Sequence, residues 1–317
     1  MSTAKYTENC SIVIPVYRSE DTIAELIQRL ATILPNLFPK FEVICVVDGS
    51  PDKSWEIICS LGKKYKWLRG VKLLRNFGQQ NATLCGVRLA KYELTVTMDD
   101  DLQHPVEELP KMVDKLRSGF DVVYGSPQKP PAGILRNMVT NFTKRTLVWA
   151  TQNRMPKDIS AFMIFRTHIR DCFKDFRSSD ANLDVLLSWG TSSFSSVKVN
   201  IEERKVGKSN YNLAKLIRMT LVILTGFSTL PLRIASVIGF LMTIVGLGVL
   251  IYILIIYFSQ GSIPGFSFLA SLIAIFSGTQ LFALGIFGEY MARIFNRSMD
   301  RPTYVIEKTI NGNTLTK

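Results

Sequence analysis

Short apolar runs alternate with amphipathic stretches through the first 125 residues of the chain. The runs are rich in β-branched residues and of strand length, which is typical of buried strands. They are residues 11–16, 41–47, 71–74, 94–98 and 122–124. The stretches between them repeat apolar residues at helical spacing, in residues 23–34, 55–64, 80–90 and 106–116. Because strands alternate with helices, we expect an open, doubly wound α/β domain with a mostly parallel sheet.

Polar residues stand where several of these strands end. Tyr17, Asp48, Arg75 and Asp99 each follow the carboxyl end of a predicted strand. In open α/β sheets, ligands bind beyond that edge of the sheet. We therefore expect a binding site there, built from loops that are distant in sequence.

The last third of the chain contains two long segments without charge. Residues 234–258 are 25 consecutive uncharged residues, and residues 263–288 are another 26. Each segment is long enough to cross the roughly 30 Å hydrocarbon core of a bilayer as a helix. Two buried helices of a large soluble protein are the alternative, but globular cores seldom hold two successive charge-free runs of this length. We expect a two-helix transmembrane hairpin.

Basic residues indicate the orientation of this hairpin. The short connection between the two segments carries no charge, whereas the outer flanks carry Lys205, Lys208, Lys215, Arg218, Arg233, Arg293, Arg297 and Arg301. Positively charged loops stay on the cytoplasmic side of a membrane. The pattern predicts an integral protein of the cytoplasmic membrane with both termini and the α/β domain in the cytoplasm.

These patterns divide the chain into five parts. Residues 211–228 mix apolar residues with lysine and arginine, as does the stretch 134–149, and either could lie in the membrane interface as an amphipathic helix. For 134–149, a helix packed on the sheet is an equal alternative. The expected parts are a cytosolic domain (1–210), a juxtamembrane amphipathic helix (211–231), two transmembrane helices (232–258 and 263–291) and a cytosolic tail (292–317).

The net charge of the chain favours anionic partners. There are 38 Lys and Arg residues against 26 Asp and Glu, a formal charge of +12, which suits nucleotide phosphates, lipid headgroups or nucleic acid. Because many of the positive residues cluster at the membrane boundary, phospholipid explains them more simply than nucleic acid does. The five cysteines are odd in number and widely spaced, so neither a disulfide framework nor a zinc site is expected.

The clearest chemical signal is the run Asp99, Asp100 and Asp101 at the end of a buried strand. Three adjacent carboxylates repel one another unless a cation lies among them, and Mg²⁺ or Mn²⁺ with a bound diphosphate is the usual occupant. A solvated acidic turn is the alternative. Asp48 is by itself equally a turn cap or a nucleoside contact. The chain has no GxGxxG or GxxxxGK[ST] motif, which argues against a dinucleotide-binding dehydrogenase or a P-loop NTPase.

Several motifs, taken together and in order, carry a resemblance to a known family. They are Ile14-Pro15-Val16-Tyr17, Val47-Asp48-Gly49-Ser50-Pro51-Asp52, Arg75-Asn76-Phe77-Gly78, Met98-Asp99-Asp100-Asp101-Leu102-Gln103, Arg204-Lys205-Val206-Gly207-Lys208-Ser209, Gly288-Glu289-Tyr290 and Arg301-Pro302. Over essentially its full length, the chain resembles family 2 glycosyltransferases of the polyprenyl-phosphate type. That group includes dolichyl-phosphate mannose synthases and bactoprenol glucosyltransferases, and its fold is the Rossmann-like GT-A fold.

The resemblance implies a role for each matching residue. Asp99 and Asp101 would form the family's DxD motif, with Asp101 as the principal ligand of Mg²⁺ or Mn²⁺, and Gln103 would lie beside the sugar and diphosphate. Asp158 would contact the sugar or orient the acceptor, although a helix cap or loop residue is the alternative. The expected nucleoside, donor and phosphate contacts are Pro15, Tyr17, Asp48, Arg75, Arg204, Lys208 and Ser209.

The chain also departs from the family's pattern at several positions. Arg18-Ser19 stands where relatives have Asn-Glu, and Val47 replaces the first acidic residue of the common Asp-Asp-Gly-Ser. Residues 126–129 lack the arginines found after this strand in relatives, and Met163 stands where many bacterial relatives have arginine. These differences could mark a different donor preference.

The expected function is membrane-bound, inverting transfer of a hexose from a nucleotide-sugar to a polyprenyl phosphate of the undecaprenyl type, with glucose and UDP-glucose favoured. A lipid phosphate is largely ionised near neutral pH, so little general-base help is needed. A non-catalytic membrane scaffold that binds nucleotide-sugars or anionic lipids is the alternative. Glycines in both predicted spans, such as Gly239 and Gly285, would permit a homo-oligomer or simply close packing of the hairpin.

Overall fold

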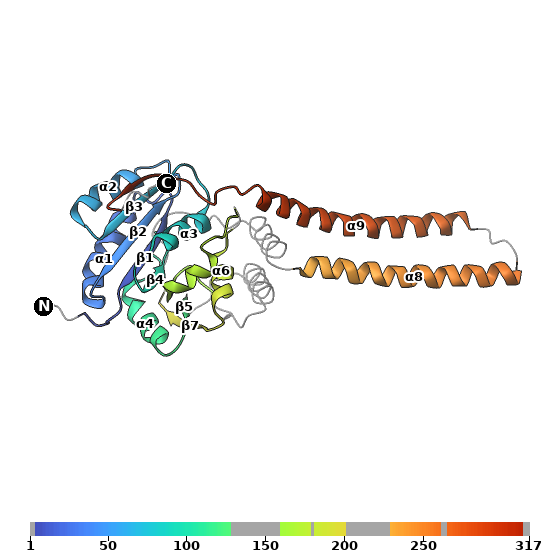
Figure 1. Cartoon of the computed structure of the whole chain (residues 1–317), viewed down its shortest axis with the longest axis horizontal. Helices are drawn as coiled ribbons and strands as arrows, with labels where there is room; N and C mark the ends of the chain where they lie inside the picture. The colour runs from blue at the N-terminus through green and yellow to red at the C-terminus, as the bar shows by residue number, and fades with distance from the viewer. Residues whose placement is uncertain (1–3, 128–158, 179–180, 201–228, 261–264, 313–317) are drawn as a thin grey trace. The chain divides into compact units, whose positions relative to one another are not determined.

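The computed structural model of the chain describes residues 4–127, 159–178, 181–200, 229–260 and 265–312 (Figure 1). The chain separates into two units. The first, here the α/β unit, comprises Met1–Met219 together with Asp300–Lys317, and the second, the helical unit, comprises Thr220–Met299.

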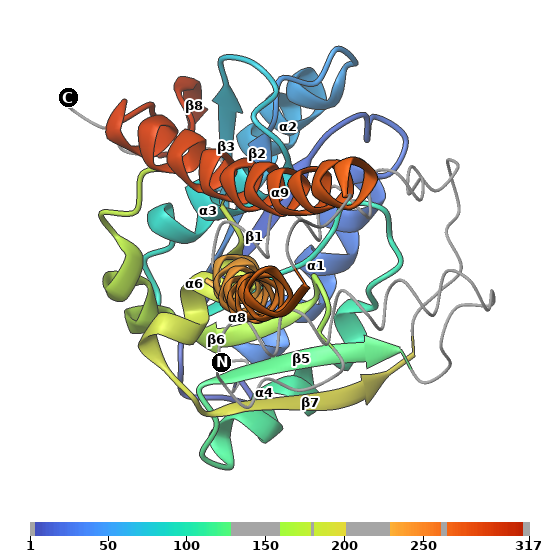
Figure 2. The ribbon, with the colours of Figure 1, turned by 90° about the vertical axis from the view of Figure 1, so that its right-hand side faces the viewer.

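One mixed sheet forms the centre of the α/β unit. In the described residues its strands are β1 (Cys10–Val16), β2 (Phe41–Val47), β3 (Leu68–Leu73), β4 (Leu94–Thr97), β5 (Val122–Pro127), β6 (Met163–Arg166), β7 (Phe194–Val199) and β8 (Ile306–Ile310). The strand order is β7-β5-β6-β4-β1-β2-β3-β8. Strands β1 to β4 run parallel, as do β5 and β7, which lie side by side in Figure 2. Strands β6 and β8 run antiparallel to their neighbours.

Helices cover both faces of this sheet. They are α1 (Ile23–Leu37), α2 (Ser54–Lys64), α3 (Gln79–Leu89), α4 (Leu109–Arg117) and α6 (Leu183–Gly190), with short 3₁₀ helices η1 (Val106–Glu108) and η2 (Thr167–Phe173). Helix α1 contacts α2 and η1 on one face, whereas α3 contacts α6 and η2 on the other. Figure 1 shows α1 and α3 on opposite sides of β1 and β2.

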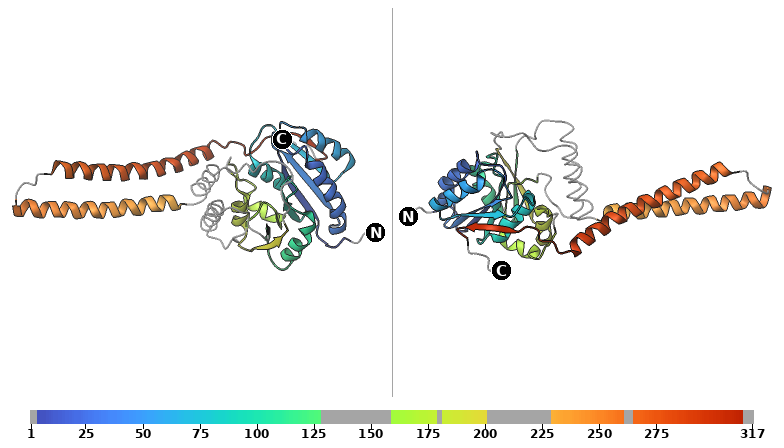
Figure 3. Two further views of the ribbon diagram at one scale, coloured as in Figure 1. Left: turned by 180° about the vertical axis from the view of Figure 1, so that it is seen from behind. Right: turned by 90° about the horizontal axis from the view of Figure 1, so that it is seen from above.

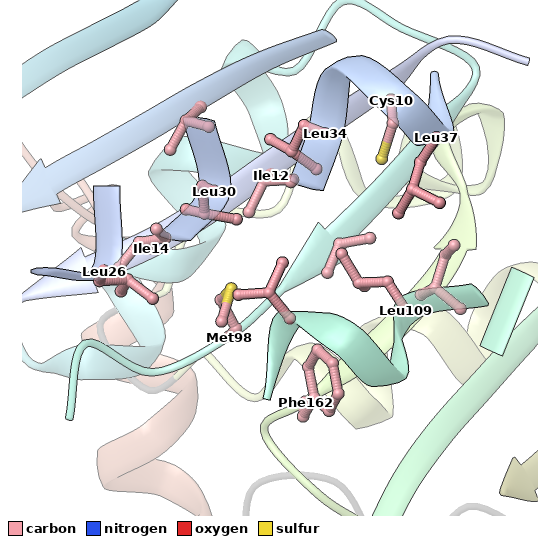
Figure 4. Close-up of a cluster of buried hydrophobic side chains, with 14 of the residues drawn as sticks. Cys10, Ile12, Ile14, Leu26, Leu30, Leu34, Leu37, Met98, Leu109 and Phe162 are labelled. Carbon is pink, nitrogen blue, oxygen red and sulfur yellow. The ribbon is translucent and has the colours of Figure 1, made fainter. Parts of the chain in front are cut away.

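The alternation of side chains along β1 explains why both faces are apolar. Ile12 and Ile14 point towards α1 and pack in the main hydrophobic cluster with Leu30 (Figure 4). The intervening Val13 faces α3, where a Cβ on Gly86 would lie 2.3 Å from Val13 Cγ1. Only glycine allows α3 to approach the sheet this closely, so Gly86 sets the height of α3 above β1.

The strands and helices expected from the first 125 residues are confirmed, with bounds that differ by a few residues. The sheet is mostly parallel, as expected, but β6 lies antiparallel between β4 and β5. Sequence analysis did not identify β6, β7, α6 or β8. Strand β7 carries polar residues at half of its positions, and three of its six residues are half-buried, so it lacks a continuous apolar run.

The C-terminal residues complete one edge of the sheet. Strand β8, drawn in red in Figures 1 and 3, pairs antiparallel with β3. Asn311 Nδ2 donates to the carbonyl oxygens of Gly62 in α2 (2.7 Å) and Leu68 in β3 (2.9 Å), which fastens the end of β8 to both elements. Residues that follow the helical unit therefore belong structurally to the α/β unit.

The helical unit contains two long helices, α8 (Leu230–Gln260) and α9 (Phe266–Ser298), which lie side by side (Figure 1). Of the described residues, the segment Pro231–Ser259 has the length and composition of a membrane span, with a mean hydropathy of 2.6 and an unburied surface. The second span, and so the two-helix transmembrane hairpin, stays a prediction. A Cβ on Gly246 would lie 2.7 Å from Phe276 Cζ, so this glycine serves the contact between α8 and α9.

A buried tyrosine–carboxylate pair joins β5 to α6 and gives the α/β unit a pH-dependent stability. Tyr124 Oη donates to Asp184 Oδ1 at 3.0 Å, and burial raises the pKa of Asp184 to about 6. Between its ordinary pKa near 3.8 and about 6, the native state binds a proton that the unfolded state does not. The free energy of unfolding therefore falls as pH rises through this window, by roughly 2 to 3 kcal/mol.

We expect Asp184→Asn to remove this dependence, because the amide oxygen still accepts from Tyr124 and carries no charge. Chemical unfolding in detergent at pH 4 and pH 7.5 should show the variant gaining stability relative to wild type at the higher pH. Asp114→Asn is the matched control, since the Asp114 side chain is 57% exposed. Equal changes in wild type and Asp184→Asn between the two pH values would contradict the expectation.

Candidate active site

The loops after β1 and β4 are joined through the middle carboxylate of the acidic run. Asp100 Oδ2 accepts a hydrogen bond from the backbone N–H of Tyr17 (3.1 Å) and another from the Ser19 hydroxyl. Burial is the main cause that raises the pKa of Asp100 to about 6, and the neighbouring Asp99 and Asp101 add to it. The Asp100 side chain therefore points towards the loop after β1 and stabilises the turn that contains Tyr17 and Ser19.

The loops after β1 and β2 are joined by a reciprocal pair of hydrogen bonds. The backbone N–H of Glu20 donates to Asp52 Oδ2, and the backbone N–H of Lys53 donates to Glu20 Oε2, both at 3.0 Å. Ser50 Oγ accepts from the backbone N–H of Arg18 at 2.7 Å. Glu20 and Asp52 thus hold the loops that follow β1 and β2 together at the carboxyl ends of these strands.

Asp48 fastens the loop after β3. Its Oδ1 accepts from the backbone N–H of Phe77 (2.7 Å) and its Oδ2 from that of Gly78 (2.8 Å), and the residue is only 2% exposed. Burial raises the pKa of Asp48, against the lowering effect of these hydrogen bonds and of Arg75. Gly49 has a φ of +58°, and a Cβ there would lie 2.3 Å from the backbone nitrogen of Asn76, so the β2 and β3 loops meet as closely as glycine allows.

Asp99 and Asp101 are the other two carboxylates at the end of β4, each with a different donor. Asp99 Oδ1 accepts from Gln79 Nε2 at 2.7 Å, and Asp101 Oδ1 accepts from the backbone N–H of Gln103 at 3.1 Å. Asp99 and Asp101 thus have hydrogen-bond partners different from those of Asp100, and their role as a DxD motif stays a prediction.

The donor set at this position fits a hard divalent cation. Carboxylate oxygens are the ligands that Mg²⁺ and Mn²⁺ prefer, and such ions commonly take their other ligands from substrate phosphates and water. Among the described residues, no group of three or more His, Cys, Asp and Glu side chains is arranged to hold a metal ion. The assignment of Asp99 and Asp101 as cation ligands stays a prediction, in which a bound diphosphate would have to supply further oxygen ligands.

His104 lies directly behind the acidic run. It stacks on Phe162 with ring centroids 5.1 Å apart, and its Nδ1 accepts from the backbone N–H of Asp99 at 3.4 Å. Burial lowers the pKa of His104 to about 4, so the imidazole is neutral at physiological pH. It supports the backbone of Asp99 from the buried side.

The remaining predicted site residues differ in how accessible they are. Tyr17 is 43% exposed, with the Arg18 guanidinium 5.5 Å from its ring centroid, and Arg75 is exposed with its guanidinium 4.4 Å from that of Phe77. Pro15 is buried within β1, paired with Val46 of β2. The other predicted residues, Asp158, Arg204, Lys208 and Ser209, lie outside the described residues, as do the segments 134–149 and 211–228.

Sequence analysis did not identify Ser19 and Gln79, and it named Asp100 only as a member of the acidic run, without its role in holding the loop after β1. Each acts through a partner at least 20 positions away in the sequence. The adjacency of Asp100 to two predicted ligands was the one available signal, because three neighbouring carboxylates cannot all point at the same ion.

In the described residues, a mostly parallel α/β sheet whose central strand β4 ends in three consecutive carboxylates is the arrangement found in the GT-A class of glycosyltransferases. A sequence model described as glycosyl transferase family 2 matches residues 11–175. The chain belongs to glycosyltransferase family 2, and the resemblance inferred from its motifs is confirmed.

Relatives of similar length extend the match beyond this domain. The chain is 30% identical over 307 residues to the undecaprenyl-phosphate 4-deoxy-4-formamido-L-arabinose transferase of Photorhabdus laumondii, which covers 96% of this chain and 94% of that protein. It is 32% identical over 309 residues to an uncharacterised glycosyltransferase of Bacillus subtilis, covering 94% and 93%.

The fold is also found among solved structures. A crystal structure of glucosyl-3-phosphoglycerate synthase from Mycobacterium tuberculosis, in complex with Mn²⁺, uridine diphosphate and glucosyl-3-phosphoglycerate, superposes with a TM-score of 0.52. It shares 18% sequence identity and covers 69% of this chain and 78% of that chain. At this identity the likeness shows the fold alone.

Proposed function

We propose that this enzyme transfers a sugar from a nucleotide-sugar to a polyprenyl phosphate of the undecaprenyl type. The observation that carries the proposal is the near full-length similarity to an undecaprenyl-phosphate sugar transferase, which extends through the long apolar helix α8. A lipid acceptor explains why a glycosyltransferase domain is joined to a membrane-spanning segment. The proposed product is a lipid-linked sugar phosphate.

Two donor sugars are favoured. The resemblance to bactoprenol glucosyltransferases favours UDP-glucose, and the printed names of several relatives favour a nucleotide-linked 4-deoxy-4-formamido-L-arabinose. Sugars of this kind differ by a few hydroxyl and amide groups, and a site built to hydrogen-bond one of them rejects another by leaving its own polar groups unpaired. We place UDP-glucose first and make the other donor an outcome of the test.

In the proposed mechanism, Asp99 and Asp101 would hold Mg²⁺ or Mn²⁺ together with the donor diphosphate. Such a cation, when bound, would neutralise the negative charge that develops on the departing nucleotide diphosphate. Tyr17 and Arg75 offer exposed surface to the nucleotide, while Asp48 and Asp100 keep their loops in place. Gln103, two residues after Asp101, is proposed to bind sugar or diphosphate oxygens.

The acceptor phosphate is the nucleophile. It is largely ionised near neutral pH, so positioning and charge stabilisation dominate over general-base catalysis. Direct displacement at the anomeric carbon forms the new C–O bond as the bond to the diphosphate breaks, with inversion of configuration. Arg204, Lys208 and Ser209 are proposed to hold phosphate oxygens near the membrane, and Asp158 to contact the sugar or orient the acceptor.

The proposed location is the cytoplasmic face of the cytoplasmic membrane. Basic residues flank both outer ends of the apolar segments, and by the positive-inside rule this distribution favours both termini in the cytoplasm. Membrane lipids are then permanent partners of the helical unit. Self-association through glycine-containing faces of the helices is a further part of the proposal, readily tested by cross-linking in membranes.

A transfer assay tests the proposed function. Detergent-purified protein is incubated with a short polyprenyl phosphate, Mg²⁺ or Mn²⁺, and labelled nucleotide-sugars that include UDP-glucose, GDP-mannose and the 4-formamido-arabinose donor. We expect organic-extractable label from one donor, dependent on metal and on the lipid phosphate. If folded protein binds lipid and nucleotide-sugar yet transfers no label from any donor, the non-catalytic scaffold is the better description.

A further inference from the structure

The first turn of α3 contacts two other parts of the α/β unit, the loop after β4 and helix α6. Gln79, the first residue of the helix, donates from Nε2 to Asp99 Oδ1 after β4 at 2.7 Å. The next residue, Gln80, accepts through Oε1 from the backbone N–H of Leu183 in α6 at 3.1 Å. The side-chain amides of Gln79 and Gln80 therefore hydrogen-bond to different elements, and of the two only Gln79 contacts the acidic run.

The backbone that carries Gln79 is itself held from two directions. Asp48 binds the two backbone N–H groups that precede the helix, those of Phe77 and Gly78. Asn81 Nδ2 donates back to the carbonyl oxygen of Phe77 at 2.8 Å. Because these hydrogen bonds fix the backbone of the turn, they also fix the position of the Gln79 Cα. The Gln79 amide is therefore directed at Asp99 although the residue is exposed.

An amide is well suited to orient a carboxylate that must also bind a cation. A hydrogen bond from a neutral donor limits rotation of the carboxylate while leaving its negative charge in place. A lysine or arginine at the same position would form a stronger, charge-assisted hydrogen bond but would cancel that charge and repel a cation. The neutral character of Gln79 thus matters as much as its donor group.

We propose that Gln79 is a positioning residue for the divalent-cation site. It fixes the carboxylate of Asp99 through its hydrogen bond, and Asp48 fixes Gln79 by holding the turn before α3. This inference rests on the proposed function, since that function assigns Asp99 and Asp101 to the cation.

The test measures Mn²⁺ binding without turnover. Free Mn²⁺ is followed by electron paramagnetic resonance during titration of the purified full-length protein in the presence of UDP. We expect Gln79→Ala to raise the Kd for Mn²⁺ by about three- to tenfold, the usual range for loss of one hydrogen bond. Gln79→Lys should raise it further at low ionic strength, and the extra loss should shrink in high salt because the added repulsion is screened.

Gln80→Ala is the matched control. It loosens the same turn through its contact with α6 but leaves the bond to Asp99 intact, so wild-type Mn²⁺ affinity is expected. Equal weakening by Gln80→Ala and Gln79→Ala would assign the effect to the helix end and overturn the inference. Wild-type Mn²⁺ affinity in both Gln79 variants would also overturn it.

The wild-type protein and Asp101→Asn separate failure of the inference from failure of the proposed metal site. If wild type binds Mn²⁺ and Asp101→Asn does not, while the Gln79 variants match wild type, only the role of Gln79 is lost. If wild type itself binds no Mn²⁺ with UDP, the metal-dependent mechanism falls and the role of Gln79 falls with it.

Discussion

Asp101→Asn is expected to reduce sugar transfer by at least about 10² to 10³-fold, the range typical of losing one group that stabilises developing charge in a transition state. The substitution removes one negative charge from the proposed cation site. The amide oxygen of asparagine can still accept from the backbone N–H of Gln103, as Asp101 Oδ1 does now at 3.1 Å. The loop after β4 should therefore keep its shape, and the loss should reflect chemistry rather than folding.

The measurement is the initial rate of lipid-extractable label at saturating Mn²⁺, together with thermal unfolding of the same preparations. Asp114→Asn is the control, because it removes the same charge from a side chain 57% exposed on α4, where it contacts Lys5. A fully active Asp101→Asn enzyme would remove Asp101 from the metal site. A variant that fails to fold would be resolved by Asp101→Glu, which keeps the charge and should retain part of the activity.

Glu42→Ala is expected to lower the free energy of unfolding by about 3 kcal/mol, because it removes a buried carboxylate that forms an ion pair with the mostly buried Arg69. Glu42 is 1% exposed. Its Oε1 accepts from Ser11 Oγ (2.7 Å) and the backbone N–H of Lys91 (2.9 Å), and its Oε2 lies 2.7 Å from Arg69 Nη1. One carboxylate thus ties β1, β2, β3 and the start of β4 at the amino edge of the sheet.

Urea unfolding in detergent compares this variant with Glu25→Ala. Glu25 forms an ion pair with Arg29 one turn along α1, but its side chain is 42% exposed, so about 0.5 kcal/mol or less is expected. Similar small losses in the two variants would show that Glu42 is not a structural centre of the sheet. Glu42→Gln should fall between them, since it keeps an acceptor for Ser11 and loses the charge opposite Arg69.

The central strands were predictable because each contains an apolar, β-branched segment between helical stretches. Residues 41–47, for example, form β2 with the bounds expected from the sequence, although they include the buried Glu42. Strand β6 has only four residues, Met163–Arg166, and it turns antiparallel between β4 and β5, a placement that depends on pairing partners distant in the sequence. Strand β8 is short and partly exposed, with charged residues at its centre, as edge strands commonly are.

The acidic run was recognisable because carboxylates after a buried strand are unusual, whereas the residues that orient them were not. Gln79 and Ser19 are ordinary polar residues whose importance lies in their distant partners, Asp99 and Asp100. Asp48 was predicted from the family motif to contact the nucleoside. Its two oxygens bind the backbone of the loop after β3, a geometry that no local pattern in the sequence expresses.

The pairing of β8 with β3 has a consequence for biosynthesis. A ribosome makes β3 early and β8 last, after both long helices of the helical unit. Until then, one edge of β3 has unpaired backbone groups, and such open edges invite association with other nascent chains. Completion of the sheet must therefore wait until both long helices have been synthesised, so the α/β unit matures only after the helical unit has been made. A protein that consists of residues 1–210 alone would lack β8, so the edge of β3 would stay unpaired.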